Sequence, residues 1–183
     1  GRNTNLYRFG TQAKSAYELN VEKVISEMLG AVYDMAGRKI GALLVLEGKT
    51  KLNEIVETGT EIDAKITKQI LCNIFIPNTP LHDGAVIIRD GKIKSAACFL
   101  PLTQRKDLSK DLGTRHRAGI GVSEISDSLI LIVSEETGHV SIARAGKIYR
   151  DVSKERLANI LKNFYKNNSE EKGLGLVKDI FNK

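Results

Sequence analysis

Residues 73–89 read N-I-F-I-P-N-T-P-L-H-D-G-A-V-I-I-R, and the rest of the chain is organised around them. A histidine, an aspartate and a glycine stand at positions 82–84, directly ahead of the apolar run at 85–88. An apolar run of this length, next to turn residues, predicts a buried strand. The sheet behind that strand would hold the carboxylate in place, and Gly84, which has no Cβ, would let a ligand lie against the backbone. The stretch therefore predicts a rigid site at the start of a central strand.

Other apolar runs predict the remaining strands of a sheet. The runs at 40–46 and 129–133 are too short for helices, so we expect strands that are buried on both faces. Asp90-Gly91 lies between two strand-like runs and predicts a type I′ hairpin turn, which requires positive φ. Further strands are expected over 92–99, 139–143 and 147–149, and a short one at the beginning of 73–89.

Helical spacing of apolar residues predicts the helices. The spacing over 21–32 predicts a helix that Asn20 would cap and Gly37 would end. Three isoleucines spaced four residues apart predict a second helix over 62–71. A third and a fourth helix are expected over 115–124, with Thr114 as the N-cap, and over 153–165.

The order of these elements predicts the fold class. Helices and strands interleave, several strands are wholly apolar, and a hairpin lies among them, so we predict a single α/β domain with a central mixed β-sheet flanked by α-helices. The domain is expected over 20–166. Residues 1–19 are weakly patterned and are predicted to form a linker or arm, and 167–183 a polar linker with a short amphipathic tail.

Composition narrows the class of protein. With 183 residues, 42% of them hydrophobic and 27% charged, the chain is typical of a soluble globular domain. No apolar run approaches the roughly 18 residues of a membrane span, and the N-terminus has no secretory signal. The chain begins Gly-Arg without Met, so we expect that a membrane anchor could have preceded it.

Charge and cysteine usage add two weaker indications. The net charge of +6 suits an anionic ligand, a nucleic acid or an acidic membrane face, although the interspersed signs favour a solubilising surface. Cys72 and Cys98 lack CxxC spacing and lie in apolar contexts. We expect both to be reduced core thiols of a cytosolic protein.

Residues 113–117, G-T-R-H-R, predict an anion site at the start of a helix. Such a start offers unpaired N–H groups and the positive end of the helix dipole, and arginine forks match phosphate oxygens. The alternative is an ordinary helix start whose arginines pair with Asp107 or Asp111. The chain has neither a Walker A motif nor GxGxxG, which excludes the common P-loop and Rossmann routes.

Two further groups could carry chemistry. The imidazole of His82 and the carboxylate of Asp83 are competent ligands for Mn²⁺ or Mg²⁺, although Asp83 could simply cap a turn. Ser134-Glu135-Glu136 follows a predicted buried strand, where open α/β sheets place ligands, and a solvated acidic turn is the alternative. His139 is expected to be a surface or half-buried residue without a special role.

Residues 81–85, L-H-D-G-A, and 113–117 resemble the DGA and RHR motifs of the diadenylate cyclase (DAC) domain family. Residues 40–44 and 133–138 are similar to that family too, and the resemblance spans roughly 21–161. Within the family the chain looks most like the membrane-tethered type. It does not look like the DNA-scanning type, because no helical DNA-binding domain follows.

The resemblance implies an enzyme that makes cyclic di-AMP from two ATP and releases two pyrophosphates. Because the product is two-fold symmetric, the simplest catalyst is a face-to-face homodimer in which each protomer brings one ATP. The family implies a divalent metal, Mn²⁺ or Mg²⁺, and leaves the choice open. It also implies a place at the cytoplasmic face of the cell membrane, with the tether outside this chain, and no nucleic-acid partner.

The resemblance also implies roles for individual residues. The catalytic residues would be Asp83, Arg115, His116 and Arg117, and the metal ligands His82 and Asp83. Contacts with ATP would come from Gly84, Ala85, Phe99, Leu100, Thr114, Ser134 and Glu136. Asp83 would help to activate the attacking 3′-hydroxyl, as base or through the metal. The two arginines would offset charge on the leaving pyrophosphate, and Phe99 would give the adenine slot an aromatic face.

Two other classes of function compete with this one. A sensing module could bind ATP or cyclic di-AMP without turnover, but a pure binder would not need the carboxylate of Asp83. A basic nucleic-acid-binding domain is disfavoured, because the chain has neither zinc-finger spacing nor an RNP-like aromatic strand.

Overall fold

A seven-stranded mixed sheet forms the centre of the computed structural model, which describes residues 4–181. The strand order is β2-β4-β3-β1-β5-β6-β7, and β1 and β3 are parallel whereas the other neighbours are antiparallel. The strands are β1 (Ala42–Leu46), β2 (Thr60–Lys65), β3 (Ala85–Arg89), β4 (Lys92–Cys98), β5 (Leu129–Val133), β6 (Val140–Arg144) and β7 (Lys147–Tyr149). The predicted α/β class with a mixed sheet is confirmed.

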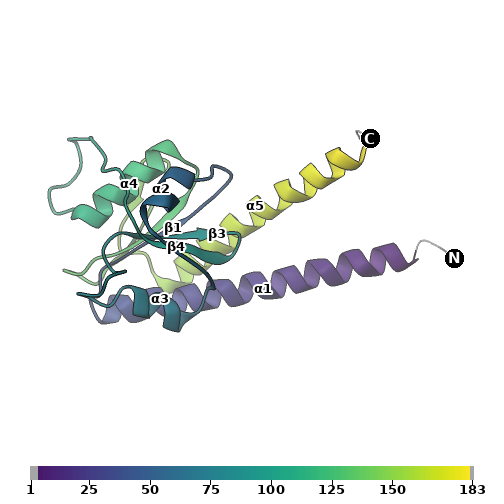
Figure 1. Cartoon of the computed structure of the whole chain (residues 1–183), viewed down its shortest axis with the longest axis horizontal. Coiled ribbons are helices and arrows are strands. Elements are labelled where there is room, and N and C mark those ends of the chain that lie inside the picture. Colours follow the sequence, from purple (N-terminus) through teal and green to yellow (C-terminus); the bar gives the residue numbers. More distant parts are fainter. Residues whose placement is uncertain (1–3, 182–183) are drawn as a thin grey trace.

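Helices cover both faces of the sheet (Figure 1). They are α1 (Thr4–Gly37), α2 (Asn53–Thr58), α3 (Lys68–Ile74), α4 (Thr114–Ile125) and α5 (Lys154–Phe181). Successive side chains of β1 alternate between two apolar cores. Leu44 packs in the core with α1, α3 and α5, and Val45 packs in the core with α2 and α4. Because both cores need apolar partners, β1 and β5 are buried along their whole length, as predicted.

The predicted tight turn between β3 and β4 is confirmed. Asp90 and Gly91 have φ of 50° and 72°, as a type I′ hairpin requires. The same chemistry recurs between β6 and β7, where Ala145 and Gly146 have φ of 50° and 74°. Both cysteines are free; Cys98 is buried and Cys72 half-buried, in keeping with core thiols.

The predicted helix over 62–71 and the strand at the beginning of 73–89 are wrong. Residues 60–65 form β2, an edge strand, and α3 begins only at Lys68, where the Thr67 hydroxyl accepts a hydrogen bond from the Ile70 N–H at 3.1 Å. The four-residue spacing of the isoleucines arose from a strand, a loop and a helix in succession. A short helix, α2, also occupies part of the polar stretch where no element was predicted.

The ends of the long helices also differ from the prediction. Asn20 lies inside α1, which starts at Thr4, and α5 continues to Phe181 instead of ending near 165. All three prolines lie between 77 and 101, so no proline breaks a helix in either terminal segment. Gly37 ends α1 as predicted. Beyond the sheet, α1 and α5 extend toward the same side of the molecule (Figure 1). No helix within residues 4–181 is long and apolar enough to cross a membrane.

Candidate functional site

The sheet topology brings the predicted site segments to one place. Because β1 and β3 are parallel, they begin on the same side, and their antiparallel neighbours β5 and β4 end there. Ala42 is paired with Val133, and Ala85 with Cys98. We call this side, formed by residues 41, 82–85, 99–100 and 134–136 with the start of α4, the amino end of the sheet.

Gly84 is required at the amino end by its backbone and by its neighbour strand. Its φ is +114°, and a Cβ there would stand 2.7 Å from the carbonyl oxygen of Cys98. Asp83 is exposed just ahead of it, and Ala85 is fully buried. The buried strand therefore fixes an exposed carboxylate, as the sequence indicated.

His82 and Asp83 offer donor atoms of the kinds that Mn²⁺ and Mg²⁺ accept. The Nδ1 atom of His82 lies 2.6 Å from the carbonyl oxygen of Thr79. Since a carbonyl only accepts, Nδ1 carries the proton and the lone pair is left on Nε2. Asp83 makes no hydrogen bond or ion pair within residues 4–181, so the turn-capping alternative has no support there. Among the described residues no three His, Cys, Asp or Glu side chains converge, so an ion would take its other ligands from substrate and water.

Arg115 stands at the start of α4, where Gly113 rather than Thr114 is the N-cap residue. The side chain of Arg115 is 24% exposed, and its Nη1 lies 3.3 Å from the Glu135 Oε2. The alternative pairing with Asp107 or Asp111 is not found, because Arg105 pairs with Asp107 and Arg150 with Asp111. Arg115 therefore lies at the amino end, beside Glu135.

His116 differs from the two arginines beside it. Its side chain faces the protein interior, with a relative exposure of 6%, whereas Arg115 and Arg117 are half-buried. Burial, reinforced by the positive charge of Arg150, lowers the pKa of His116 below its ordinary value. At neutral pH it is therefore a neutral residue and adds no positive charge to the cluster.

The turn after β5 is held by the Ser134 hydroxyl. Its Oγ accepts hydrogen bonds from the N–H groups of Glu136 at 3.3 Å and Thr137 at 3.2 Å. Glu136 is exposed, and Glu135 is the carboxylate that reaches Arg115. The acidic triplet signalled this turn in the sequence, but only the geometry shows which carboxylate faces the helix. His139, just after the turn, is exposed, as predicted.

Phe99 and Leu100 follow the last residue of β4 and differ sharply in exposure. Phe99 is 76% exposed, although its N–H is fixed by a hydrogen bond to the Thr58 hydroxyl at 2.8 Å. Leu100 is buried in the core with α2 and α4. The pairing of Ala85 with Cys98 places the exposed aromatic ring beside the segment that carries Asp83. The amino end therefore combines an aromatic face, a carboxylate and the Arg115 guanidinium.

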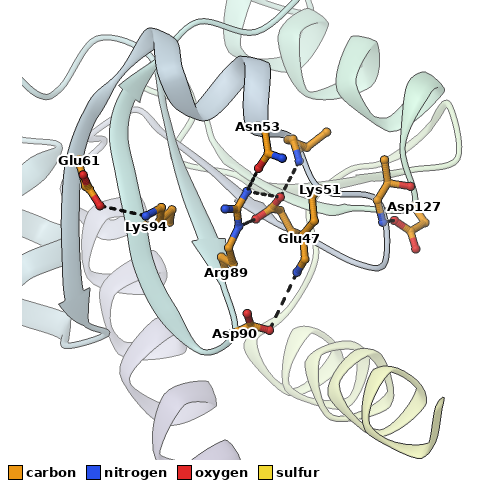
Figure 2. Close-up of polar contacts among 10 residues, drawn as sticks. Glu47, Lys51, Asn53, Glu61, Arg89, Asp90, Lys94 and Asp127 are labelled. Atoms are coloured by element: carbon orange, nitrogen blue, oxygen red, sulfur yellow. Dashed lines mark hydrogen bonds and ion pairs between the residues drawn. The ribbon is translucent and has the colours of Figure 1, made fainter. Parts of the chain in front are cut away.

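The opposite side, where β1 and β3 end, has a different character, and we call it the carboxyl end of the sheet. The side chain of Glu47 has no exposed surface and accepts hydrogen bonds from Arg89 Nε at 2.5 Å and Nη2 at 3.1 Å. Figure 2 shows this pair. The Leu52 N–H also donates to Glu47 at 2.6 Å, and Asn53 accepts from Arg89 at 2.9 Å. A cavity of about 550 Å³ lies here between α1 and α5, but its buried carboxylate is already saturated.

Comparisons with known proteins agree with the geometry. A family model described as DisA bacterial checkpoint controller nucleotide-binding matches residues 29–148. The cyclic di-AMP synthase CdaA of Bacillus subtilis is 46% identical over 171 residues, which are 93% of this chain and 61% of that protein. The diadenylate cyclase of Mycoplasma genitalium is 35% identical over 74% of this chain and 68% of its own length.

Two solved structures are also similar to this chain. A double mutant of DacA from Staphylococcus aureus has a TM-score of 0.77 and 49% identity, over 79% of this chain and 96% of that one. A hypothetical membrane spanning protein from Bacillus cereus has a TM-score of 0.68 and 47% identity, over 70% of this chain and 63% of that one. The chain spans about three-fifths of the length of the CdaA protein and of the diadenylate cyclase of Listeria monocytogenes, at 61% and 58%.

Proposed function

The chain belongs to the diadenylate cyclase (DAC) domain family, and on this premise we propose that it condenses two ATP into cyclic di-AMP with release of two pyrophosphates. The observation that carries the proposal is that the segments bearing Asp83, Phe99 and Arg115 lie at the same end of the sheet. Relatives named diadenylate cyclase support the reaction.

The aromatic and basic residues hold the two ends of ATP in the proposed reaction. The exposed ring of Phe99 stacks on adenine, while buried Leu100 forms the floor of the slot. Arg115 and Arg117 bind the triphosphate at the start of α4, together with Thr114 and the helix N–H groups. As pyrophosphate leaves, the same arginines offset its growing charge.

Asp83 acts on the attacking group. It helps to activate the 3′-hydroxyl, which must approach the α-phosphate of the other ATP in line with the departing pyrophosphate. Gly84 and Ala85 bring the backbone close to the nucleotide, and Ser134 and Glu136 line the phosphate region. Bound by His82 and Asp83, a Mn²⁺ or Mg²⁺ ion would neutralise charge on phosphate oxygens.

The proposed active form is a homodimer in which two amino ends face each other. One protomer offers one aromatic face and one arginine cluster, whereas the product contains two equivalent linkages. A two-fold axis between the ends supplies both halves of the reaction. If the dimer is transient, specific activity rises with protein concentration, whereas a stable dimer gives a flat profile.

We also place the protein at the cytoplasmic face of the membrane, through a tether outside this chain. The support is the similarity to a structure described as a membrane spanning protein and the share of the longer relatives that the chain covers. Helix α1 begins on the side of the molecule away from the amino end, where a preceding tether would leave the site free (Figure 1).

The deciding experiment is to incubate the protein with ATP and Mn²⁺, or with Mg²⁺, and to separate the nucleotides by chromatography. Cyclic di-AMP together with pyrophosphate is the expected result. Bound ATP without product, at protein concentrations where a dimer is measured by sedimentation, would contradict the cyclase and favour a sensing module.

A further inference from the structure

Gly41 and Arg115 come from different parts of the chain and meet at the amino end. Gly41 is buried and directly precedes β1, and Arg115 is the second residue of α4. A Cβ on Gly41 would stand 2.6 Å from the Arg115 Cζ and 3.1 Å from its Nε. Because Cβ atoms essentially never come within 3.0 Å of another heavy atom, the guanidinium occupies space that any side chain at position 41 would fill.

Space, and not backbone conformation, is what requires a glycine here. Gly41 does not adopt a left-handed φ, so an alanine could take its backbone conformation without strain. The residue therefore differs from Gly84, whose φ of +114° demands glycine in any case. The three heavy atoms nearest to a Cβ at position 41 all belong to Arg115.

The other side of the Arg115 guanidinium is held by Glu135, 3.3 Å from its Nη1. The turn that carries Glu135 rests on the end of α1, since a Cβ on Gly138 would stand 2.6 Å from the Ala36 carbonyl oxygen. The guanidinium therefore lies between Gly41, just after α1, and the Glu135 carboxylate, whose turn packs on the end of α1 through Gly138.

We propose that Gly41 is a positioning residue for the nucleotide site, because its missing side chain lets the Arg115 guanidinium settle against the start of β1 and face the triphosphate. The inference rests on the proposed function, in which Arg115 binds a phosphate of ATP. A methyl group at position 41 pushes the guanidinium away. The fold keeps its shape, because the displaced atoms are the end of a flexible, partly exposed side chain.

Gly41→Ala is expected to raise the dissociation constant for ATP about tenfold, as loss of a positioned binding group does. It should also lower kcat, because the displaced Arg115 no longer faces the leaving pyrophosphate. The matched control is Gly37→Ala, where no atom lies within 4 Å of the new Cβ. That control should leave ATP binding unchanged and should not lower the melting temperature, because alanine favours the helix more than glycine does.

The decisive comparison uses Arg115→Ala and the double variant Gly41→Ala/Arg115→Ala. If Gly41 acts through Arg115, the double variant binds ATP as weakly as Arg115→Ala alone, because the alanine then enters space that the arginine has left. The proposal would be overturned if the two substitutions multiplied their effects on the ATP dissociation constant. It would also be overturned if Gly41→Ala alone left that constant unchanged. Unfolding by Gly41→Ala in both backgrounds would overturn it too, since the backbone itself would then need the glycine.

Two readouts separate this inference from the cyclase itself. ATP binding, measured by calorimetry, does not depend on turnover, so a protein that binds ATP but makes no cyclic di-AMP still tests Gly41. The Arg115 Nε resonance in an NMR spectrum needs no nucleotide at all. It should move in Gly41→Ala and stay in Gly37→Ala, and an unmoved resonance in Gly41→Ala would contradict the proposed contact.

Discussion

The two ends of the β1–β3 pair use the same kinds of residue in opposite ways. At the carboxyl end, the buried carboxylate of Glu47 is paired with the half-buried guanidinium of Arg89. At the amino end, Asp83 is exposed without a partner among the described residues, and Arg115 has one exposed carboxylate beside it. Both ends are fixed by the same buried strands. The difference lies in how much hydrogen-bonding capacity is left over.

A binding site needs polar side chains that sit on rigid elements and still have free hydrogen-bonding atoms. A saturated pair holds the loop after β1 in place and has nothing to offer a ligand. An unsatisfied carboxylate and a half-satisfied arginine contribute little to folding and remain available to a substrate. Substitutions at the amino end should therefore change activity, and those at the carboxyl end should change stability.

Asp83→Asn should produce the largest change. It keeps the shape of the side chain and removes its charge, so cyclisation is expected to fall about 10³-fold, within the range for loss of a general base. ATP affinity and melting temperature should stay close to those of the wild type. Glu61→Gln, which removes an exposed carboxylate paired with Lys94, is the control and should keep full activity. Normal turnover by Asp83→Asn would remove this residue from the reaction.

Glu47→Gln tests the other end of the comparison. It leaves the Arg89 guanidinium, 20% exposed, without its carboxylate, which should lower the free energy of unfolding by about 3 kcal/mol. Breaking the exposed Glu61–Lys94 pair, also drawn in Figure 2, should cost less than about 1 kcal/mol. Urea unfolding measures both. Equal costs would mean that burial does not distinguish the two ion pairs.

Arg115→Ala should weaken ATP binding about tenfold, because a fork-shaped donor to phosphate is lost. Little stability should be lost with it, since its partner Glu135 is exposed and returns to water. Arg105→Ala, which removes an arginine paired with Asp107, is the matched control. Calorimetric titration with ATP in the absence of turnover separates the two, and equal affinities would argue against the phosphate role.

The smallest expected effect concerns pH and His116. Because the folded pKa lies below the ordinary value of 6.5, the unfolded chain binds the proton first as the pH falls. Stability should therefore be unaffected above pH 6.5 and should decline as the pH drops from there toward the folded pKa. His116→Gln should flatten this part of the stability profile. A profile that is equally steep in the variant would assign the acid sensitivity to other groups.

Much of the fold follows from local pattern. Wholly apolar runs identified β1 and β5, and Asp-Gly identified the hairpin. Burial and positive φ each restrict the residue type at a position, so both can be read from the sequence. The spacing of Ile62, Ile66 and Ile70 predicted a helix that does not exist. These isoleucines lie in a strand, a loop and a helix in turn, four residues apart by coincidence. The start of α1 and the end of α5 were not predicted, since no proline or cap marks them.

The sequence indicated which residues belong to the candidate site, but not how their side chains are oriented. The segments that carry Asp83 and Arg115 lie at the same end of the sheet. The choice of Glu135 over Glu136 and the burial of His116 depend on the turn and helix orientation, which a pattern does not contain. The contact between Gly41 and Arg115 joins residues 74 positions apart, so only tertiary structure could show it.

The direction in which α1 and α5 extend has a practical meaning for handling the protein. Both helices carry the chain away from the side where α1 meets the Glu135 turn (Figure 1). A fluorescent label, a fusion partner or a bead can be attached at either terminus without covering the arginines or the exposed phenylalanine. Immobilised copies would still present that surface to the solution, so a sensor chip could report the encounter of a second copy and its dependence on nucleotide.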